Sequence, residues 1–224
     1  MSNPGTEALP WATIGKAMTT LLAGDTCYVK VGTYVTTVGD FNTPGFNPTN
    51  SGTAANPIAM RRFGSDVARL SNNGGANTIC GTQAKNYIIW DGFLIDGGSG
   101  GVVSMFGTTG SIVENFTIRN VSHNTSDNIQ GIRLEEAISC ITRNNTVHDI
   151  SAVPITEDGV GIRHYPTTSC IIEFNEVYAC ADGIYLKEGN HDDVIRYNYV
   201  RGPLYRTGIR IDGTNANTQT FCGI

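Results

Sequence analysis

The chain of 224 residues has few charges and no long apolar segment. Charged residues make up 16% of it, against about 25% in an average domain, and the formal net charge is −5. Proteins that bind nucleic acids or anionic membranes are usually basic, so we expect neither partner. No apolar run reaches the roughly 18 residues of a membrane-spanning helix. The first residues, MSNPG, show no signal peptide, which leaves the compartment open.

Cysteine and histidine occur without the spacing of a metal site. None of the six cysteines forms a C-x-x-C pair, so we expect no structural zinc. The chain is too long to need a disulfide framework, and most of the cysteines are interpreted as buried free thiols. His123, His148 and His164 are interpreted as packing or surface residues.

Small polar residues are abundant instead, with 27 Gly, 26 Thr and 20 Asn. Such a chain turns often, which favours short strands over a helical bundle. One helix is predicted at residues 11–22, before the stop at Gly24. A strand broken at Gly32 is predicted at residues 26–35, and a long loop at 36–57. The apolar stripe of the predicted helix consists of Ile14, Ala17, Met18, Leu21 and Leu22.

From about residue 86 the chain repeats itself in two interleaved series. Five similar segments end at residues 95, 118, 147, 177 and 200, so the steps are 23, 29, 30 and 23. Four Gly-Ile segments alternate with the later ones and begin at Gly131, Gly161, Gly183 and Gly208, the last of them after residue 200. Two interleaved series whose spacing varies together indicate a solenoid with two or three strands in each coil. The variation in spacing is explained by insertions in the turns that connect the strands. The alternative, an antiparallel sandwich, gives no reason for one residue type to recur in one register.

Three sets of residues share a position in the repeat. We expect the amides of Asn145, Asn175 and Asn198 to form a hydrogen-bonded ladder along the coil. Cys140 and Cys170 also share a position, where stacked free thiols and a disulfide both remain open. A column of charges is expected on the outer face: Asp91, Glu114, Arg143, Glu173 and Arg196.

Three stretches together resemble a known superfamily. They are Gly5-Thr6 with Pro10–Ile14, then Gly24–Val29 with Gly32-Thr33-Tyr34, then Asn56-Pro57-Ile58 and the repeats. The chain resembles the right-handed parallel β-helix proteins of the pectate-lyase-like superfamily, which includes many polysaccharide lyases and some glycosidases. The resemblance implies an all-β, right-handed parallel β-helix with an N-terminal capping α-helix. Residues 1–24 would be the lead and cap and residues 25–224 the coils of one domain, in an extracellular or cell-surface protein.

The end of the coil shows no matching cap. Residues 214–224 are too short and polar to close a coil. Either the chain is a truncated piece, or its open end packs against another copy, which predicts a homo-oligomer through the C-terminal end.

Residues that point outward from the Gly-Ile strands predict a binding surface. The isoleucine of each strand should point inward and the next residue outward. Arginine forks match carboxylates and tyrosine faces suit sugar rings, so the partner we expect is an acidic polysaccharide. The first outward column is Arg133, Arg163, Tyr185 and Arg210, and the second is Glu135, Tyr165, Lys187 and Asp212.

These columns suit a lyase that cleaves a uronate-containing chain by β-elimination. Such an enzyme neutralises the uronate carboxylate, removes the proton next to it and expels the glycosidic oxygen. We assign Lys187 as the base, Arg163 and Arg210 as carboxylate binders, and Tyr185 or Tyr165 as proton donor or stacking platform. The resemblance places a catalytic Lys or Arg on such a strand, although no complete family motif is present. The substrate-binding residues would be Arg133, Tyr165 and Asp212.

Calcium is the expected helper, because it can bridge protein acids and substrate. Its candidate ligands are Asp158, Asp182 and Glu135, although Asp158 and Asp182 differ in register and also suit turns. A glycoside hydrolase would need two carboxylates about 5–9.5 Å apart. The run His191-Asp192-Asp193 follows a turn signal, which argues against that activity. The alternative to a lyase is a non-catalytic carbohydrate-binding or structural module, whose cations would form an ordinary solvated face.

Overall fold

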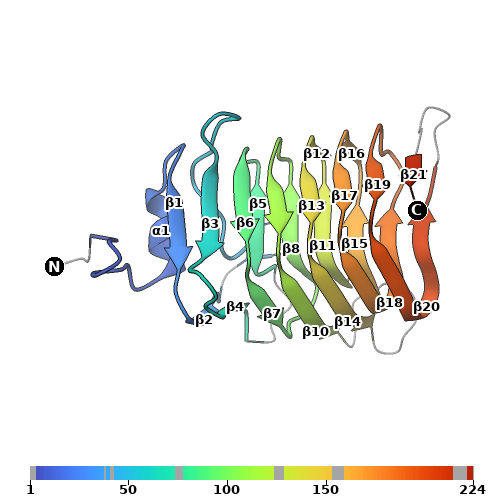
Figure 1. The fold of residues 1–224 in the computed structure, drawn as a ribbon, viewed down its shortest axis with the longest axis horizontal. Coiled ribbons are helices and arrows are strands. Elements are labelled where there is room, and N and C mark those ends of the chain that lie inside the picture. The colour runs from blue at the N-terminus through green and yellow to red at the C-terminus, as the bar shows by residue number, and fades with distance from the viewer. Residues whose placement is uncertain are drawn as a thin grey trace.

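A computed structural model describes residues 4–37, 39–40, 43–73, 78–123, 129–152, 159–213 and 221–223. Within them the chain winds around one axis as a parallel β-helix, and the coils follow one another from the N-terminal to the C-terminal end (Figure 1). Each strand pair between coils is parallel. The predicted β-helix is therefore confirmed, and the antiparallel sandwich is wrong.

One segment of each coil belongs to an eight-stranded sheet, called sheet A. Its strands are three to five residues long, so each covers only one side of the coil. Sheet A consists of β1 (Thr26–Val29), β3 (Ile58–Arg62), β6 (Ile88–Asp91), β9 (Ile112–Glu114), β13 (Ile141–Arg143), β17 (Ile171–Glu173), β19 (Val194–Arg196) and β21 (Phe221–Gly223).

The rest of each coil forms sheet B, which has two limbs. The first limb consists of β2 (Gly32–Val35), β4 (Ala68–Ser71), β7 (Leu94–Asp96), β10 (Thr117–His123) and β14 (Thr146–Ala152). The second consists of β5 (Cys80–Gln83), β8 (Gly101–Phe106), β11 (Ile129–Glu135) and β15 (Gly159–His164).

Two strands of sheet B join its limbs. β18 (Glu176–Leu186) pairs with both β14 and β15, and β20 (Tyr199–Ile211) pairs with β18 along both halves. In the two coils before them, residues 124–128 and 153–158 separate the first limb from the second. A short pair, β12 (Ala137–Ile138) and β16 (Thr167–Thr168), lies at the corner that leads back to sheet A.

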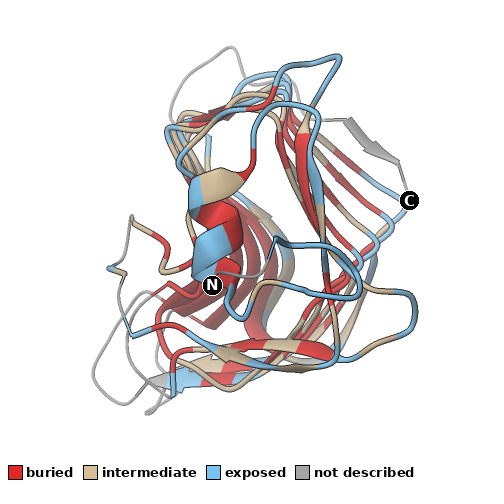
Figure 2. Cartoon of the chain, turned by 90° about the vertical axis from the view of Figure 1, so that its left-hand side faces the viewer, coloured by how far each residue is buried: buried red, intermediate tan, exposed pale blue. Residues whose placement is uncertain are grey.

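The N-terminal helix is shorter than predicted. α1 spans Ile14–Thr20, because the hydroxyl of Thr13 accepts a hydrogen bond from Lys16 N and caps the helix there. It lies across the N-terminal end of the coils and buries one face (Figure 2). Four residues of the predicted stripe are buried, but Leu22 is 61% exposed because the chain is extended from Leu21 onward. None of the described helices is long and apolar enough to cross a membrane.

Both repeat series stack as predicted. Ile95, Ile118, Val147, Val177 and Val200 occupy successive positions of the first limb. The isoleucines that follow the glycines, at 132, 162, 184 and 209, stack along the second limb.

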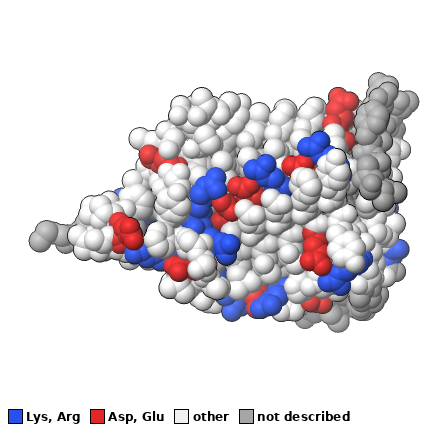
Figure 3. Space-filling view, viewed as in Figure 1, with Lys and Arg blue, Asp and Glu red and all other residues white. Residues whose placement is uncertain are grey.

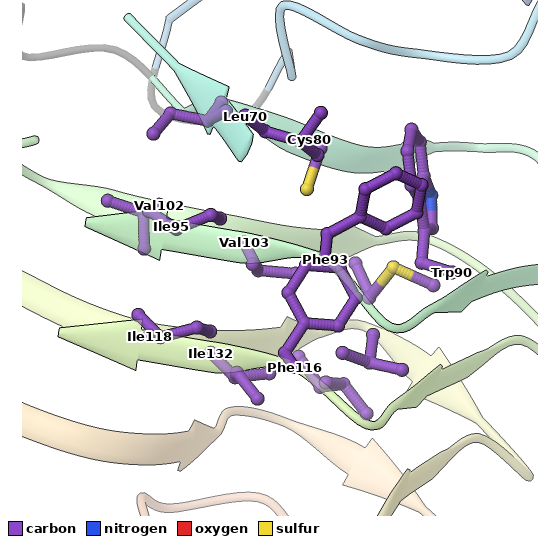
Figure 4. Packing of buried hydrophobic residues seen from close by; sticks show 14 of the residues in the cluster. Leu70, Cys80, Trp90, Phe93, Ile95, Val102, Val103, Phe116, Ile118 and Ile132 are labelled. Atoms are coloured by element: carbon purple, nitrogen blue, oxygen red, sulfur yellow. The ribbon is translucent and has the colours of Figure 1, made fainter. Parts of the chain in front are cut away.

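The glycines of the second series have a packing role. A Cβ added to Gly161 would lie 2.4 Å from Cγ1 of Val177 and 2.7 Å from the carbonyl oxygen of Gly183. Only glycine therefore lets the second limb approach the valines across the interior. Aromatic rings fill the wider part of the core, where Phe93 lies between Trp90 and Phe116 with ring centroids 5.8 and 5.6 Å away (Figure 4).

The asparagine ladder is present at the corner between sheet A and the first limb. Asn145 Nδ2 donates to Asn175 Oδ1, and Asn175 Nδ2 donates to Asn198 Oδ1, both at 2.9 Å. The same amide oxygens accept backbone N–H groups of the preceding coil, which satisfies buried donors at this turn. Cys140 and Cys170 are stacked free thiols, with Cys140 N 3.3 Å from Cys170 Sγ.

Candidate functional site

The two predicted columns lie side by side on the second limb, and we call these eight residues the strip. Arg133, Arg163, Tyr185 and Arg210 are neighbours in register on β11, β15, β18 and β20. The second column follows from backbone hydrogen bonds of 2.9 Å that Tyr165, Lys187 and Asp212 donate to the preceding coil. The structure therefore brings the residues together as the repeat predicted.

Exposure along the strip differs from the prediction. Arg133 is only 1% exposed and Arg163 and Tyr185 are 7% exposed, whereas Lys187, Arg210 and Asp212 are partly exposed. A residue that points away from the core is therefore not always accessible. The accessible part of the strip lies toward its C-terminal end.

Arg133 is buried because its own strand supplies its counter-ion. Its Nε donates to Glu135 Oε2 at 2.7 Å, and a second guanidinium nitrogen also contacts that oxygen. Burial lowers the pKa of Arg133. The prediction that Arg133 lines an open substrate surface is wrong.

Tyr185, Arg210 and Asp212 form one cluster. The Tyr185 hydroxyl donates to Asp212 Oδ2 at 2.6 Å, Arg210 donates to both Asp212 oxygens, and its guanidinium lies 4.5 Å from the Tyr185 ring centroid. Burial and this hydrogen bond raise the pKa of Tyr185 to about 12. The hydrogen bonds from Tyr185 and Arg210 lower the pKa of Asp212. Arg210 is therefore engaged by a protein carboxylate.

Arg163, Tyr165 and Lys187 form a second cluster. The Lys187 ammonium lies 4.8 Å from the centroid of the Tyr165 ring, and the Arg163 guanidinium lies 5.7 Å from the same centroid. Within the described residues no carboxylate lies within ion-pair distance of Lys187. Two cations therefore flank one aromatic ring, and one of them has no acid as partner there.

The described residues do not fit a calcium site. Asp182 is fully buried and accepts hydrogen bonds from Arg206 and from Thr207, the latter at 2.8 Å. Glu135 holds Arg133, and β15 lies between its strand and that of Asp182. Asp158 lies outside the described residues. Calcium prefers carboxylates without such cationic partners, so no step is assigned to it.

The acidic run near the next corner does not form a glycosidase pair. Asp193 is 4% exposed and accepts from Cys170 N at 2.8 Å. Asp192 is exposed and has a positive φ of 56°, typical of a turn. The two carboxylates are therefore held in different environments, one inside the protein and one in solvent.

Charges also line the outer face of sheet A, where Figure 3 shows red and blue side chains along one row. The Glu114 carboxylate forms ion pairs with Arg143 at 2.7 Å and with Arg61 at 3.6 Å. The Glu173 carboxylate forms an ion pair with Arg196 at 2.7 Å. Arg61 also contacts Asp91 and so separates two neighbouring acids. We call these six residues the charge ladder, which confirms the predicted column and adds Arg61 to it.

One column was missed by sequence reasoning. On the first limb the rings of His148 and Tyr178 stack at 4.5 Å, and the Arg201 guanidinium lies 3.7 Å from the Tyr178 ring centroid. Each residue comes directly after a valine of the first repeat series. Extending that alignment by one position would have found it.

Known proteins give only a distant likeness. No protein-family model matches the chain, and no curated protein sequence does. The solved structures that resemble it include an alginate lyase from Paenibacillus sp. str. FPU-7, with 16% identity, a TM-score of 0.48 and coverage of 89% of this chain and 72% of that one. A rhamnogalacturonan lyase has 17% identity and a TM-score of 0.39, covering 95% and 60%. Pectate lyase Pel9A has 10% identity and a TM-score of 0.41, covering 97% and 75%.

At these identities and TM-scores, the likeness says nothing about residues or activity of this chain. The parallel β-helix stands on the strand registers described above. The substrates in those names are properties of the proteins that carry them.

Proposed function

We propose that the accessible end of the strip binds an acidic polysaccharide and cleaves it as a lyase. The observation that supports this is the cluster of Arg163, Tyr165 and Lys187. Its two cations lie on one ring, and among the described residues Lys187 has no carboxylate within 4 Å, although Asp212 is near enough to feel its charge. A cation without a direct ion pair can contact a substrate carboxylate or, when neutral, accept a proton.

Each residue of the cluster has a separate role in the proposed β-elimination. Arg163 was predicted to bind the uronate carboxylate directly, but it is only 7% exposed. We assign it an electrostatic role instead: its positive charge stabilises the charge that develops on the carboxylate when the adjacent proton leaves. Lys187, in its neutral form, accepts that proton, and the Tyr165 ring keeps its amine in place. Electrons of the broken C–H bond form the new double bond and expel the glycosidic oxygen, which needs a proton.

We assign Tyr165 as the proton donor because it is partly exposed, whereas Tyr185 is buried and its hydroxyl donates a hydrogen bond to Asp212. Tyr185 and Arg210 then act as positioning residues, since they fix Asp212 beside Lys187. An extracellular location and an oligomer formed through the C-terminal end remain predictions, whereas the described candidate ligands for calcium are occupied by arginines. In the last coil Ile209 and Ile211 are 40% and 39% exposed, although the residues at the same positions one coil earlier are buried.

A second candidate is a carbohydrate-binding module without catalysis. It is favoured by the pairing of Arg133 with Glu135 and of Arg210 with Asp212, which removes two of the three arginines from substrate binding. In that case the strip would bind a polyanion weakly and leave it intact.

One screen distinguishes these functions. The protein is incubated with polymannuronate, polyguluronate, polygalacturonate and a glucuronate polymer, each with and without calcium. Ultraviolet absorbance of the unsaturated product is followed. Binding is measured separately in native gels that contain the same polymers, or a neutral glucan as control. A protein that binds the polymer migrates more slowly through such a gel.

Absorbance with any polymer supports the lyase. Retardation by acidic polymers without absorbance supports the binding module and contradicts the lyase. Neither absorbance nor retardation would overturn both functions.

A further inference from the structure

The corner between β15 and β19 holds a buried group of three different metal-ligating side chains. One ligand atom each of His164, Cys170 and Asp193 lies within 4.8 Å of the other two. His164 and Cys170 are fully buried, and Asp193 is 4% exposed. Asp193 and Cys170 belong to successive coils, and His164 projects into the interior from β15. The strip lies on the outer face, so this group is separate from the proposed active site.

Polar contacts hold His164 and Asp193 side by side. His164 Nδ1 lies 3.3 Å from Asp193 Oδ2 and 3.4 Å from the Thr167 hydroxyl, which also donates to Asp193 Oδ2. Nδ1 is therefore the ring nitrogen that faces the other ligands, whereas Nε2 is buried without a hydrogen-bond partner among the described residues. A neutral imidazole has one donor and one acceptor nitrogen, so with its proton on Nε2 the ring presents Nδ1 as the electron-pair donor.

We infer that this corner binds a zinc ion through His164, Cys170 and Asp193. A thiolate, an imidazole and a carboxylate are the donors that zinc prefers, whereas calcium and magnesium prefer oxygen donors alone. Two ligands about 2.0 Å from a tetrahedral zinc lie about 3.3 Å apart, which matches the His164–Asp193 separation.

Cys140 lies next in the stack, where its backbone N–H is 3.3 Å from Cys170 Sγ, but it is not one of the three residues whose ligand atoms lie close together. Cys170 is therefore the single thiolate ligand of the inferred site. Because all three ligands are buried, a zinc ion held by them would be closed to solvent, as structural zinc sites are. It would link the coils of Cys170 and Asp193, and so support the C-terminal coils.

Sequence reasoning excluded structural zinc because no C-x-x-C pair is present. The ligands here are spaced by 6 and 23 residues, which is a within-turn step followed by one repeat of the coil. Only the stacking of coils brings Asp193 under Cys170. The spacing rule therefore fails for a site built across a solenoid.

Metal content tests the inference directly. The full chain is produced in zinc-supplemented medium and, separately, in cobalt-supplemented medium, because the buried corner must take up its ion during folding. We expect about one zinc per chain by mass spectrometry. The cobalt form should show thiolate-to-cobalt charge-transfer absorption in the near ultraviolet, which reports a cysteine ligand.

Two variants and a control make the result specific. Cys170→Ser should lose the charge-transfer band, and Asp193→Asn should lower the zinc content while keeping an oxygen for Cys170 N. Cys180→Ser, which changes another fully buried thiol away from the corner, should keep both signals. Wild-type protein with little zinc or without the cobalt band overturns the inference, whether or not the variants fold. Equal zinc content in Cys170→Ser and Cys180→Ser does so too.

Discussion

The charge ladder of sheet A and the strip of sheet B use the same residue types in different ways. In the ladder each arginine pairs with an acid on a neighbouring coil, as Arg143 does with Glu114. In the strip Arg133 and Arg210 pair with acids two residues along their own strands, and Arg210 also lies 3.8 Å from Asp182 of the neighbouring coil. These paired arginines are occupied by protein carboxylates. Among the described residues Lys187 has no carboxylate within 4 Å, so it is the cation of the strip that differs most from those of the ladder.

The strip itself changes along the axis. Its N-terminal part is buried around Arg133, and its C-terminal part opens around Lys187 and Asp212. We therefore expect substitutions in the first part to affect stability and those in the second part to affect activity.

Lys187→Ala should give the largest effect. Loss of a general base lowers the rate by about 10²–10⁴-fold, so product absorbance should fall by at least about 100-fold. The melting temperature should stay unchanged, because Lys187 forms no ion pair in the described residues. Arg143→Ala in the charge ladder is the matched control and should keep full activity. An equal loss in both variants would mean that the two faces do not differ as proposed.

Glu135→Ala should be the most destabilising change in the strip. It leaves the buried guanidinium of Arg133 without its carboxylate, which lowers the free energy of unfolding by about 3 kcal/mol. Glu114→Ala in the charge ladder should cost only about 1 kcal/mol, because its two arginines are about one-third exposed and can be solvated. Urea denaturation measures both values. The reverse order would contradict the burial of the strip at Arg133.

Tyr185→Phe should cost about 1 kcal/mol near neutral pH, through loss of the hydrogen bond to Asp212. The pKa of Tyr185 is raised to about 12 in the folded protein, above the usual value of about 10. Its contribution to stability is therefore complete below about pH 10 and is lost as the pH rises toward 12. Tyrosinate absorbance should lose a late-titrating component in the variant, and an unchanged titration would refute the assignment.

Arg196→Ala should have the smallest effect, about 0.5 kcal/mol. Arg196 lies toward the C-terminal end of the charge ladder, and its side chain is 44% exposed. High salt should remove most of the difference from wild type, because exposed pairs are screened. A loss of several kcal/mol that persists in high salt would show that the ladder is a major source of stability.

Much of the fold could be predicted from the repeats. Stacking requires one register, so the positions of Asn175, Ile162 and Arg163 in the repeat already fixed their neighbours. Both ends of α1 were misplaced, because the hydroxyl of Thr13 caps the helix at Ile14 and the extended conformation of Leu21 ends it at Thr20, although the apolar stripe continues to Leu22.

The candidate site was harder to predict. The register of a strand gives the direction of a side chain but not its exposure. The burial of Arg133 depends on its ion pair with Glu135, which the repeat alone did not predict. Asp182 was predicted as a calcium ligand because its true partners, Arg206 and Thr207, could not be identified from the repeat. Both come from β20, whose register relative to β18 shifts just before Asp182. A pattern at one fixed spacing cannot show such a contact.

The corner before the second limb absorbs the differences in coil length. Five residues separate β10 from β11 and six separate β14 from β15, while β18 and β20 pass the same corner without a break. Stacking on either side is the same in all these coils. The number of residues between the two limbs can therefore change from coil to coil while the register on both sides is kept, so chain length at this point can be varied independently of the core.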